Sequence, residues 1–259
     1  MPSRLGLGGS RFGSFGNPAS PADSERLVRS ALDLGVRVID TASIYGQGDS
    51  ERIIGRAISG RRNEAFVVTK AGLTFSSKYR LLRPVKPLLR RLLARRGSRV
   101  TARRGDAMAS DWRPEAITAS LDASLRRLRT EHVDAFLLHS PPAAAVPPLV
   151  DAMIRLRDAG KALRIGVSCD DMSAVDAALA APDFSILELP WDVIAALEDR
   201  IKTIEHRGIA VLAREVIAQQ PGIAPNEAVA RAMAHPAIDC TIVGTGNASH
   251  LRAMAALQG

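Results

Sequence analysis

The stretches V-I-D-T-A-S-I-Y (residues 38–45), V-V-T-K (67–70) and F-L-L-H (136–139) are the most informative part of the sequence about the fold. Each begins as an apolar run and reaches an ionisable residue where the run stops, as at the carboxyl end of a buried parallel strand. In a parallel α/β barrel these strand ends line the active-site face. The candidate active-site residues are therefore a carboxylate, a phenol, an ammonium and an imidazole, namely Asp40, Tyr45, Lys70 and His139.

On both sides of these stretches, strand-like runs alternate with helix-like runs along the chain, which is typical of parallel βαβ units. Strands are expected at about 4–7, 36–41, 65–70, 133–139, 162–168, 184–189, 209–214 and 239–244. Helices are expected at about 21–34, 49–58, 114–128, 146–159, 172–180, 193–206, 225–234 and 248–257. With 259 residues and no linker-like stretch, this pattern predicts a single (β/α)8 TIM barrel domain over residues 1–259.

Composition argues against a membrane-spanning, secreted or disulfide-rich protein. Charged residues make up 24% of the chain, and no run approaches the roughly 18 apolar residues of a membrane span. The first residues lack the charged and apolar regions of a secretion signal. Two cysteines, Cys169 and Cys240, suit a reducing cytoplasm and argue against a disulfide framework or a Cys-rich metal site. The run Gly6-Leu7-Gly8-Gly9-Ser10 lacks the spacing of a Rossmann dinucleotide turn.

The four candidate residues are suited to proton donation. A phenol has a pKa near 10, so a proton-donating Tyr45 needs a neighbour that stabilises its phenolate. At an effective dielectric of about 20, a Lys70 ammonium ~4 Å away contributes about 4 kcal/mol, or roughly three pK units, before burial opposes it. Asp40 would keep Lys70 charged, and His139 would donate to a carbonyl oxygen or relay a proton. Since none of these groups can supply a hydride, a reduction would need a cofactor.

The Asp, Tyr, Lys and His in this order resemble the tetrad of the aldo-keto reductases. The resemblance extends over almost the whole chain, and its most specific part is residues 160–168, G-K-A-L-R-I-G-V-S, which is similar to the family's G-K-I-R-x-I-G-V-S. This resemblance implies an NADP-dependent enzyme that reduces an aldehyde or ketone to an alcohol, with NADPH as cofactor, a small-molecule carbonyl substrate and Tyr45 as general acid.

The same resemblance implies where the cofactor would bind. Those positions are Ser168, Cys169, Glu188, Trp191, Arg214, Gly244, Thr245, Gly246, Asn247, His250 and Arg252. Ser168 matches a contact to the nicotinamide carboxamide, but Cys169 and Glu188 stand where the family has Asn and Gln, so the carboxamide carbonyl would lose a donor. Arg214 replaces a ring-stacking aromatic residue. Residues 241–247 match the adenosine-phosphate segment, where Gly244 and His250 replace basic residues and Arg252 could substitute.

A strongly basic segment follows the third expected strand. Residues 78–104 contain eleven Lys and Arg and no acid, whereas the other 24 basic residues are outnumbered by 27 acidic ones. Leucines recur at helical spacing from about Pro87, which predicts a basic amphipathic insertion after strand 3. It could be a lid over the barrel mouth, or a surface for an anionic membrane or an acidic partner. Nucleic acid is not expected, because interleaved aromatic residues are lacking.

Two other functions remain open. Lys70 could form a Schiff base in a lyase on the same barrel, although this needs a lowered Lys70 pKa and the adjacent Asp40 opposes it. Alternatively, the altered cofactor positions and the basic segment fit a non-catalytic nicotinamide-binding module.

Overall fold

A closed barrel of parallel strands forms the centre of the molecule, as predicted. The computed structural model describes residues 1–14, 19–75 and 108–258. Around the barrel the strands lie in the order β1-β10-β9-β8-β7-β6-β3-β2. They are β1 (Leu5–Gly8), β2 (Val38–Asp40), β3 (Phe66–Ala71), β6 (Val133–His139), β7 (Ala162–Ser168), β8 (Ile186–Pro190), β9 (Ala210–Arg214) and β10 (Cys240–Val243).

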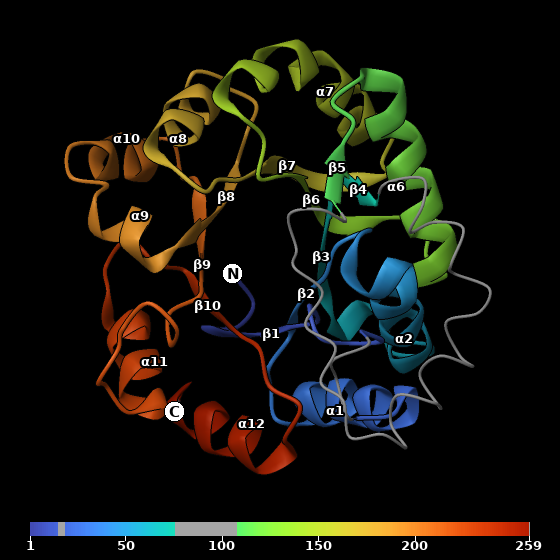
Figure 1. Ribbon diagram of the computed structural model, residues 1–259, viewed down its shortest axis with the longest axis vertical. Helices are drawn as coiled ribbons and strands as arrows, with labels where there is room; N and C mark the ends of the chain where they lie inside the picture. The colour runs from blue at the N-terminus through green and yellow to red at the C-terminus, as the bar shows by residue number, and fades with distance from the viewer. Residues whose placement is uncertain (15–18, 76–107, 259) are drawn as a thin grey trace.

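Helices surround the strands as an outer ring (Figure 1). They are α1 (Pro21–Asp33), α2 (Asp49–Ala57), α6 (Pro114–Leu128), α7 (Val150–Asp158), α8 (Met172–Leu179), α9 (Trp191–Ala195), α10 (Arg200–His206), α11 (Pro225–Ala234) and α12 (Ala248–Ala255). Short 3-10 turns occur at η1 (Tyr45–Gly48), η2 (Arg62–Glu64), η4 (Ala143–Ala145), η5 (Pro147–Leu149) and η6 (Ala256–Gln258). Among the described residues, none of these helices has the length and apolar character that crossing a bilayer requires.

Two expected helices differ from the observed ones. The stretch expected at 193–206 is divided into α9 and α10, and between them Glu198 has a φ of 39°, which a continuous α-helix does not allow. The stretch expected at 146–159 begins as the 3-10 turn η5, which contains two prolines, and becomes α-helical only at Val150.

An antiparallel hairpin was not predicted. β4 (Leu73–Phe75) pairs with β5 (Met108–Ser110), although most of the sequence that connects them is the basic segment. The basic segment at 78–104 lies outside the described residues, so its predicted amphipathic helix and its predicted partners stay predictions.

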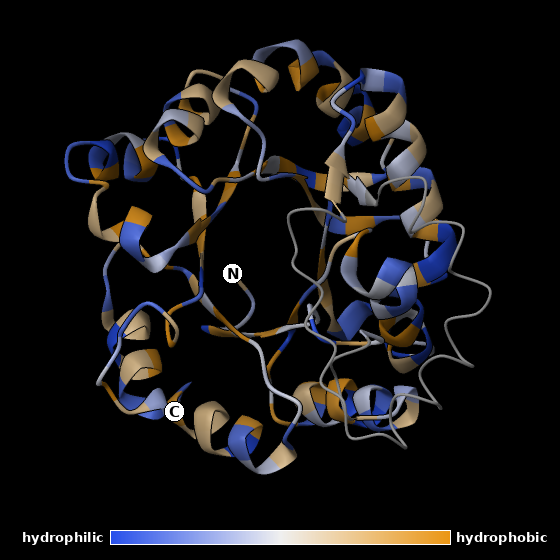
Figure 2. Ribbon diagram, in the orientation of Figure 1, coloured by the Kyte–Doolittle hydropathy of each residue, from blue (hydrophilic) through white to orange (hydrophobic). Residues whose placement is uncertain are grey.

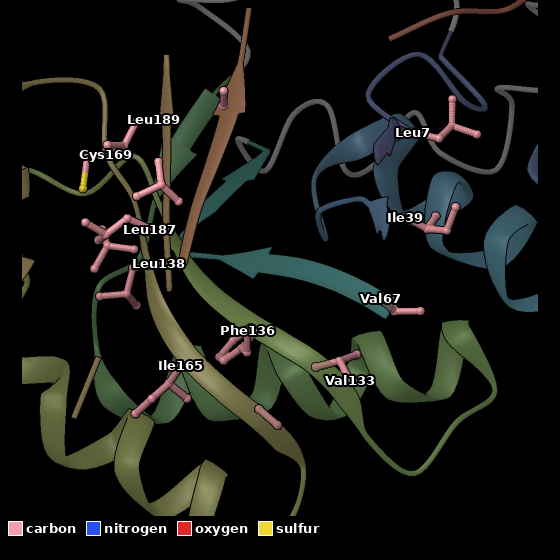
Figure 3. Packing of buried hydrophobic residues seen from close by; sticks show 14 of the residues in the cluster. Leu7, Ile39, Val67, Val133, Phe136, Leu138, Ile165, Cys169, Leu187 and Leu189 are labelled. Carbon is pink, nitrogen blue, oxygen red and sulfur yellow. The ribbon is translucent and has the colours of Figure 1, made fainter. Parts of the chain in front are cut away.

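Strand side chains divide between two apolar clusters. Inside the barrel, Val38, Val68, Leu137, Ile186 and Leu212 belong to one cluster. Side chains of the opposite parity pack between the barrel and the helices, as the close-up in Figure 3 shows for residues such as Val67, Phe136, Ile165 and Leu187. In Figure 2 the surrounding helices alternate between hydrophobic and hydrophilic residues, as expected for elements with one face on this outer cluster.

Gly166 allows β7 and β8 to lie close together. A Cβ at this position would overlap the backbone carbonyl oxygen of Ile186, its partner in the β7–β8 register. We therefore expect Gly166→Ala to lower the free energy of unfolding by about 1–3 kcal/mol or more, because the barrel wall must shift. Urea denaturation measures the effect, with Gly244→Ala as the control because a Cβ there meets no atom within 4 Å. Equal stability of the two variants would contradict the prediction.

Candidate functional site

Strand alternation directs a set of polar residues toward the inside of the barrel at its carboxyl end. Each lies two positions after a small or apolar residue at a position that faces the inside of the barrel. Because side chains two positions apart on a strand point to the same face, these polar side chains also face inward. These residues are Asp40, Lys70, His139, Ser168, Glu188 and Arg214. The register places several of them side by side, since His139 pairs with Ser168 and Ser168 pairs with Glu188.

Lys70 lies between two carboxylates. Its Nζ donates a hydrogen bond to Asp40 Oδ1 and another, of 3.2 Å, to the backbone carbonyl of Thr41. On its other side, Glu188 Oε2 lies 3.0 Å from Nζ as an ion pair. The side chain of Lys70 is wholly buried, and those of Asp40 and Glu188 are nearly so. The sequence predicted the partner Asp40 but not the partner Glu188.

Tyr45 reaches this cluster from η1, the turn that follows β2. Its backbone N–H donates to the Ala42 carbonyl at 3.0 Å, and Gly46 and Gln47 then adopt left-handed backbone angles that reverse the chain. The phenol ring lies edge-on to the His139 imidazole, with ring centroids 5.6 Å apart. Lys70 Nζ lies 5.5 Å from the centroid of the same ring. The structure thus brings together all four tetrad candidates.

The charges in the cluster shift three pKa values. Burial raises the pKa of Tyr45, and the opposing effect of Lys70 does not offset it, so the pKa lies above its ordinary range and not below it as expected. For Asp40, burial and then the nearby Glu188 raise the pKa to about 8 against the lowering effect of Lys70. Burial disfavours the charge of Lys70, yet Asp40 and Glu188 together hold its pKa above the ordinary value.

His139 is uncharged at neutral pH. Burial, together with the positive charges of Lys70 and Arg214, lowers its pKa to about 3. Its Nδ1 is buried and has no hydrogen-bond partner among the described residues. A neutral imidazole with a free ring nitrogen is suited to hold a polar group of a ligand.

The lowered pKa of His139 predicts an acid-dependent stability. A folded pKa below the ordinary 6.5 contributes stability that is present above pH 6.5 and is lost as the pH falls toward about 3. Between about pH 6 and pH 4, we expect the free energy of unfolding to fall by about 1–2 kcal/mol more in the parent than in His139→Asn. Urea denaturation across this range measures it, with the exposed His206→Asn as control. Parallel pH profiles of the parent and His139→Asn would contradict the prediction.

The residues expected to contact a nicotinamide carboxamide separate into two groups. Ser168 Oγ lies 3.2 Å from Glu188 Oε1, and both side chains are buried at the carboxyl end of the barrel. The Cys169 thiol instead packs in the outer hydrophobic cluster near Leu187 and Leu189 (Figure 3), and burial raises its pKa. Cys169 instead contacts the site residues through its backbone: its N–H donates to the Glu188 carbonyl at 2.9 Å, and its carbonyl accepts from Arg214 Nη2 at 3.1 Å.

Arg214 is held by carboxylates around the barrel mouth. Its guanidinium pairs with Asp170, with Glu215 at 2.6 Å, and through Nε with Glu188 Oε1 at 3.6 Å. The Nε atom is buried and forms no hydrogen bond with a described residue. These three carboxylates fix the orientation of the guanidinium, and the sequence did not predict them as its partners. Asp170 and Glu215 were not among the candidates predicted from the sequence, although each directly follows a candidate: Asp170 follows Cys169, and Glu215 follows Arg214.

Trp191 lies at the start of α9 and packs toward α11. Its ring contacts are an edge-on contact with His235, at a centroid distance of 5.9 Å, and the Arg231 guanidinium, 5.8 Å from the ring centroid. The predicted role of Trp191 in cofactor binding stays a prediction.

The segment predicted to hold the cofactor phosphates leads into α12. Thr245 Oγ1 accepts from the backbone N–H of Asn247 at 3.0 Å, and Asn247 Oδ1 caps the helix by accepting from Ser249 N at 2.8 Å. Among the predicted cofactor positions here, Gly244, Gly246, Asn247, His250 and Arg252 are exposed, whereas Thr245 is buried. The backbone amides at the start of α12 and the guanidinium of Arg252 suit an anion.

A surface hollow lies elsewhere, between α2 and α6. Its volume is about 400 Å³, and it is lined by Arg52, Arg56, Ala123, Arg126, Arg127 and Arg129. Three of its arginines already pair with acids: Arg52 with Asp49, Arg56 with Glu25 and Arg127 with Glu51. We regard it as a solvated basic surface and not as part of the site. Within the described ranges, no group of His, Cys, Asp and Glu is arranged to hold a metal ion.

Comparison of the sequence with known proteins identifies a family. The profile of the Aldo/keto reductase family matches residues 4–227. Aldo-keto reductase YhdN of Bacillus subtilis is 29% identical over 74% of this chain, and 6-dehydroglucose reductase of Agrobacterium fabrum is 31% identical over 78%. The matches span 50% and 56% of those relatives, so the chain corresponds to about half of their length.

Solved structures share the fold. The holo form of aldo-keto reductase AKR11C1 from Bacillus halodurans has a TM-score of 0.76 at 18% identity, covering 98% of this chain and 86% of its own. An aldo-keto reductase from Klebsiella pneumoniae in complex with NADPH has a TM-score of 0.69 at 21% identity, covering 98% of this chain and 85% of its own. At these identities the likeness concerns the barrel fold.

Proposed function

Because the chain belongs to the aldo/keto reductase family, we propose that it is an oxidoreductase that reduces a small aldehyde or ketone to an alcohol with NADPH. The observation that carries the proposal is the convergence of Asp40, Tyr45, Lys70 and His139 in one buried cluster at the carboxyl end of the barrel. Barrel enzymes bind and convert their substrates at this end.

In this proposal Tyr45 is the general acid. Its raised pKa keeps the phenol protonated at neutral pH, and the proton passes to the carbonyl oxygen as that oxygen gains negative charge. Lys70 then stabilises the phenolate, and Asp40 holds Lys70 in place. Neutral His139 donates a hydrogen bond that orients the carbonyl oxygen. When bound, NADPH supplies the hydride.

The residues of the chain fit such a cofactor. Glu188 Oε2 lacks an aligned donor among the described residues and can accept from a carboxamide NH2, while Arg214 Nε lacks an acceptor and can donate to its carbonyl. Arg214 thus offers the donor whose loss the sequence predicted at Cys169. Residues 244–247, together with His250 and Arg252, would hold the phosphates through backbone amides, hydrogen bonds and the positive charge of Arg252. NADPH in the Klebsiella pneumoniae relative supports this choice of cofactor.

The lyase alternative is disfavoured by the surroundings of Lys70. A Schiff-base lysine needs a neutral amine, but two buried carboxylates raise the pKa of Lys70 and hold it charged. The non-catalytic module remains an outcome of the experiment below.

The first test of the proposal is a calorimetric titration of the purified protein with NADPH and with NADH. Saturable binding of NADPH that weakens in Arg252→Ala, together with NADPH consumption on a panel of aldehydes and ketones, is expected. Binding without turnover of any carbonyl would favour the non-catalytic module. No binding of either cofactor would overturn the proposed function, and covalent trapping of a substrate on Lys70 by borohydride would support the lyase.

A further inference from the structure

The Lys70 ammonium has polar neighbours on several elements. Its Nζ donates to Asp40 and to the Thr41 carbonyl, and Glu188 Oε2 lies 3.0 Å from Nζ as an ion pair. The same Nζ lies 5.5 Å from the centroid of the Tyr45 ring. Glu188 and the phenol therefore share one ammonium group.

Glu188 is not fully satisfied in this arrangement. Its side chain is 1% exposed, yet Oε2 has no aligned hydrogen-bond donor among the described residues, despite its closeness to Lys70. The neighbouring Arg214 Nε is likewise buried without an acceptor, 3.6 Å from Oε1. A buried acceptor and a buried donor that both lack hydrogen bonds destabilise the folded protein unless a ligand bonds to both of them. A primary carboxamide has the matching NH2 donor and C=O acceptor.

We propose that Glu188 is a positioning residue that weakens the effect of the Lys70 charge on the Tyr45 phenol until a primary carboxamide engages the Glu188 carboxylate. This inference rests on the proposed function, in which the carboxamide belongs to the nicotinamide. An N–H of the ligand then donates to the unpartnered Oε2 and offsets part of its negative charge. Lys70 then acts more strongly on the phenolate, so cofactor binding and acid strength are coupled through one side chain.

The charges around Tyr45 determine the direction of the effect. Lys70 on β3 and Arg214 on β9 favour the phenolate, whereas Asp40 on β2 and Glu188 on β8 oppose it. His139 on β6 is uncharged in the neutral and alkaline range. Removing the charge of Glu188 removes one opposing group and releases Lys70 at the same time. Both changes lower the pKa of Tyr45.

The chain offers a direct reporter, because it contains only two tyrosines, Tyr45 and Tyr79. In a Tyr79→Phe background, ultraviolet absorbance of the phenolate reports on Tyr45 alone. In the free protein we expect the ionisation midpoint of Tyr45 to lie well above that of an ordinary phenol. Glu188→Gln should lower this midpoint by about one pH unit or more. Glu215→Gln is the matched control, since Glu215 contacts Arg214 but not Lys70 among the described residues. Circular dichroism at each pH confirms that the proteins remain folded.

Ligands with and without the carboxamide test the coupling. NADPH should lower the Tyr45 midpoint in the Tyr79→Phe protein, whereas 2′-phospho-ADP-ribose, which lacks the nicotinamide, should not. In Glu188→Gln the difference between the two ligands should largely disappear.

Equal midpoints in Tyr79→Phe with and without Glu188→Gln, or an equal effect of both ligands, would overturn the inference even if the protein reduces carbonyls. If Glu188→Gln does not fold, the comparison of the two ligands in Tyr79→Phe decides alone. Failure of NADPH to bind would instead overturn the proposed function, while the titration of the two free proteins would still decide the role of Glu188.

Discussion

Replacement of Tyr45 by Phe is expected to lower kcat for carbonyl reduction by about 10²–10⁴-fold while leaving NADPH affinity within a few-fold of the parent. The substitution removes only the hydroxyl, which is the proposed proton donor, and proton donation by a positioned side chain contributes a rate factor of this size. The ring itself is retained, so its edge-on contact with His139 and its position beside Lys70 should persist. Steady-state kinetics and calorimetry on the same preparations measure the two quantities.

Tyr79→Phe provides the matched control for Tyr45→Phe, because it removes the other phenolic hydroxyl of the chain. Its kcat should stay close to that of the parent. If Tyr45→Phe retained most of the activity, a different group would have to supply the proton, and the assignment of Tyr45 would be wrong. If its activity and NADPH binding were lost together, the substitution would have disturbed the site as a whole.

The second large effect is expected for stability. Lys70→Met should lower the free energy of unfolding by about 3–5 kcal/mol at pH 10, because it removes the counter-charge shared by the buried Asp40 and Glu188. The penalty should be smaller near pH 6, because the pKa of Asp40 is raised to about 8 in the parent and Asp40 is then protonated with or without Lys70. Urea denaturation at both pH values gives the difference.

Two further variants isolate the cause of this destabilisation. Lys161→Met removes an ammonium group that pairs with Asp122 at 2.7 Å on the surface, and it should cost at most about 1 kcal/mol. The double variant Lys70→Met/Glu188→Gln should recover part of the loss, because one of the two uncompensated charges is gone. If Lys70→Met and Lys161→Met were equally stable, the buried cluster would not depend on its counter-charge.

Much of the fold could be predicted from local patterns in the sequence. The run Val133–His139 has the predicted bounds, because an apolar stretch that is interrupted only by Asp134 and ends at His139 is visible within one segment. The prediction of one helix at 193–206 was wrong, and the β4–β5 hairpin was not predicted. Both depend on features without a local periodicity, namely one residue with a positive φ and a pairing across the residues between β4 and β5.

The local pattern of the sequence predicts the alternation of strands and helices, and with it the residues at the inner carboxyl ends of the strands. It also predicts Asp40, Tyr45, Lys70 and His139 as one candidate group, because a period of two and a strand end are local properties. In contrast, three features follow from the folded arrangement: Glu188 pairs with Lys70, the Cys169 thiol faces the outer cluster, and burial raises the pKa of Tyr45. These outcomes depend on the register between strands and on desolvation, which sums over side chains brought together from distant parts of the chain.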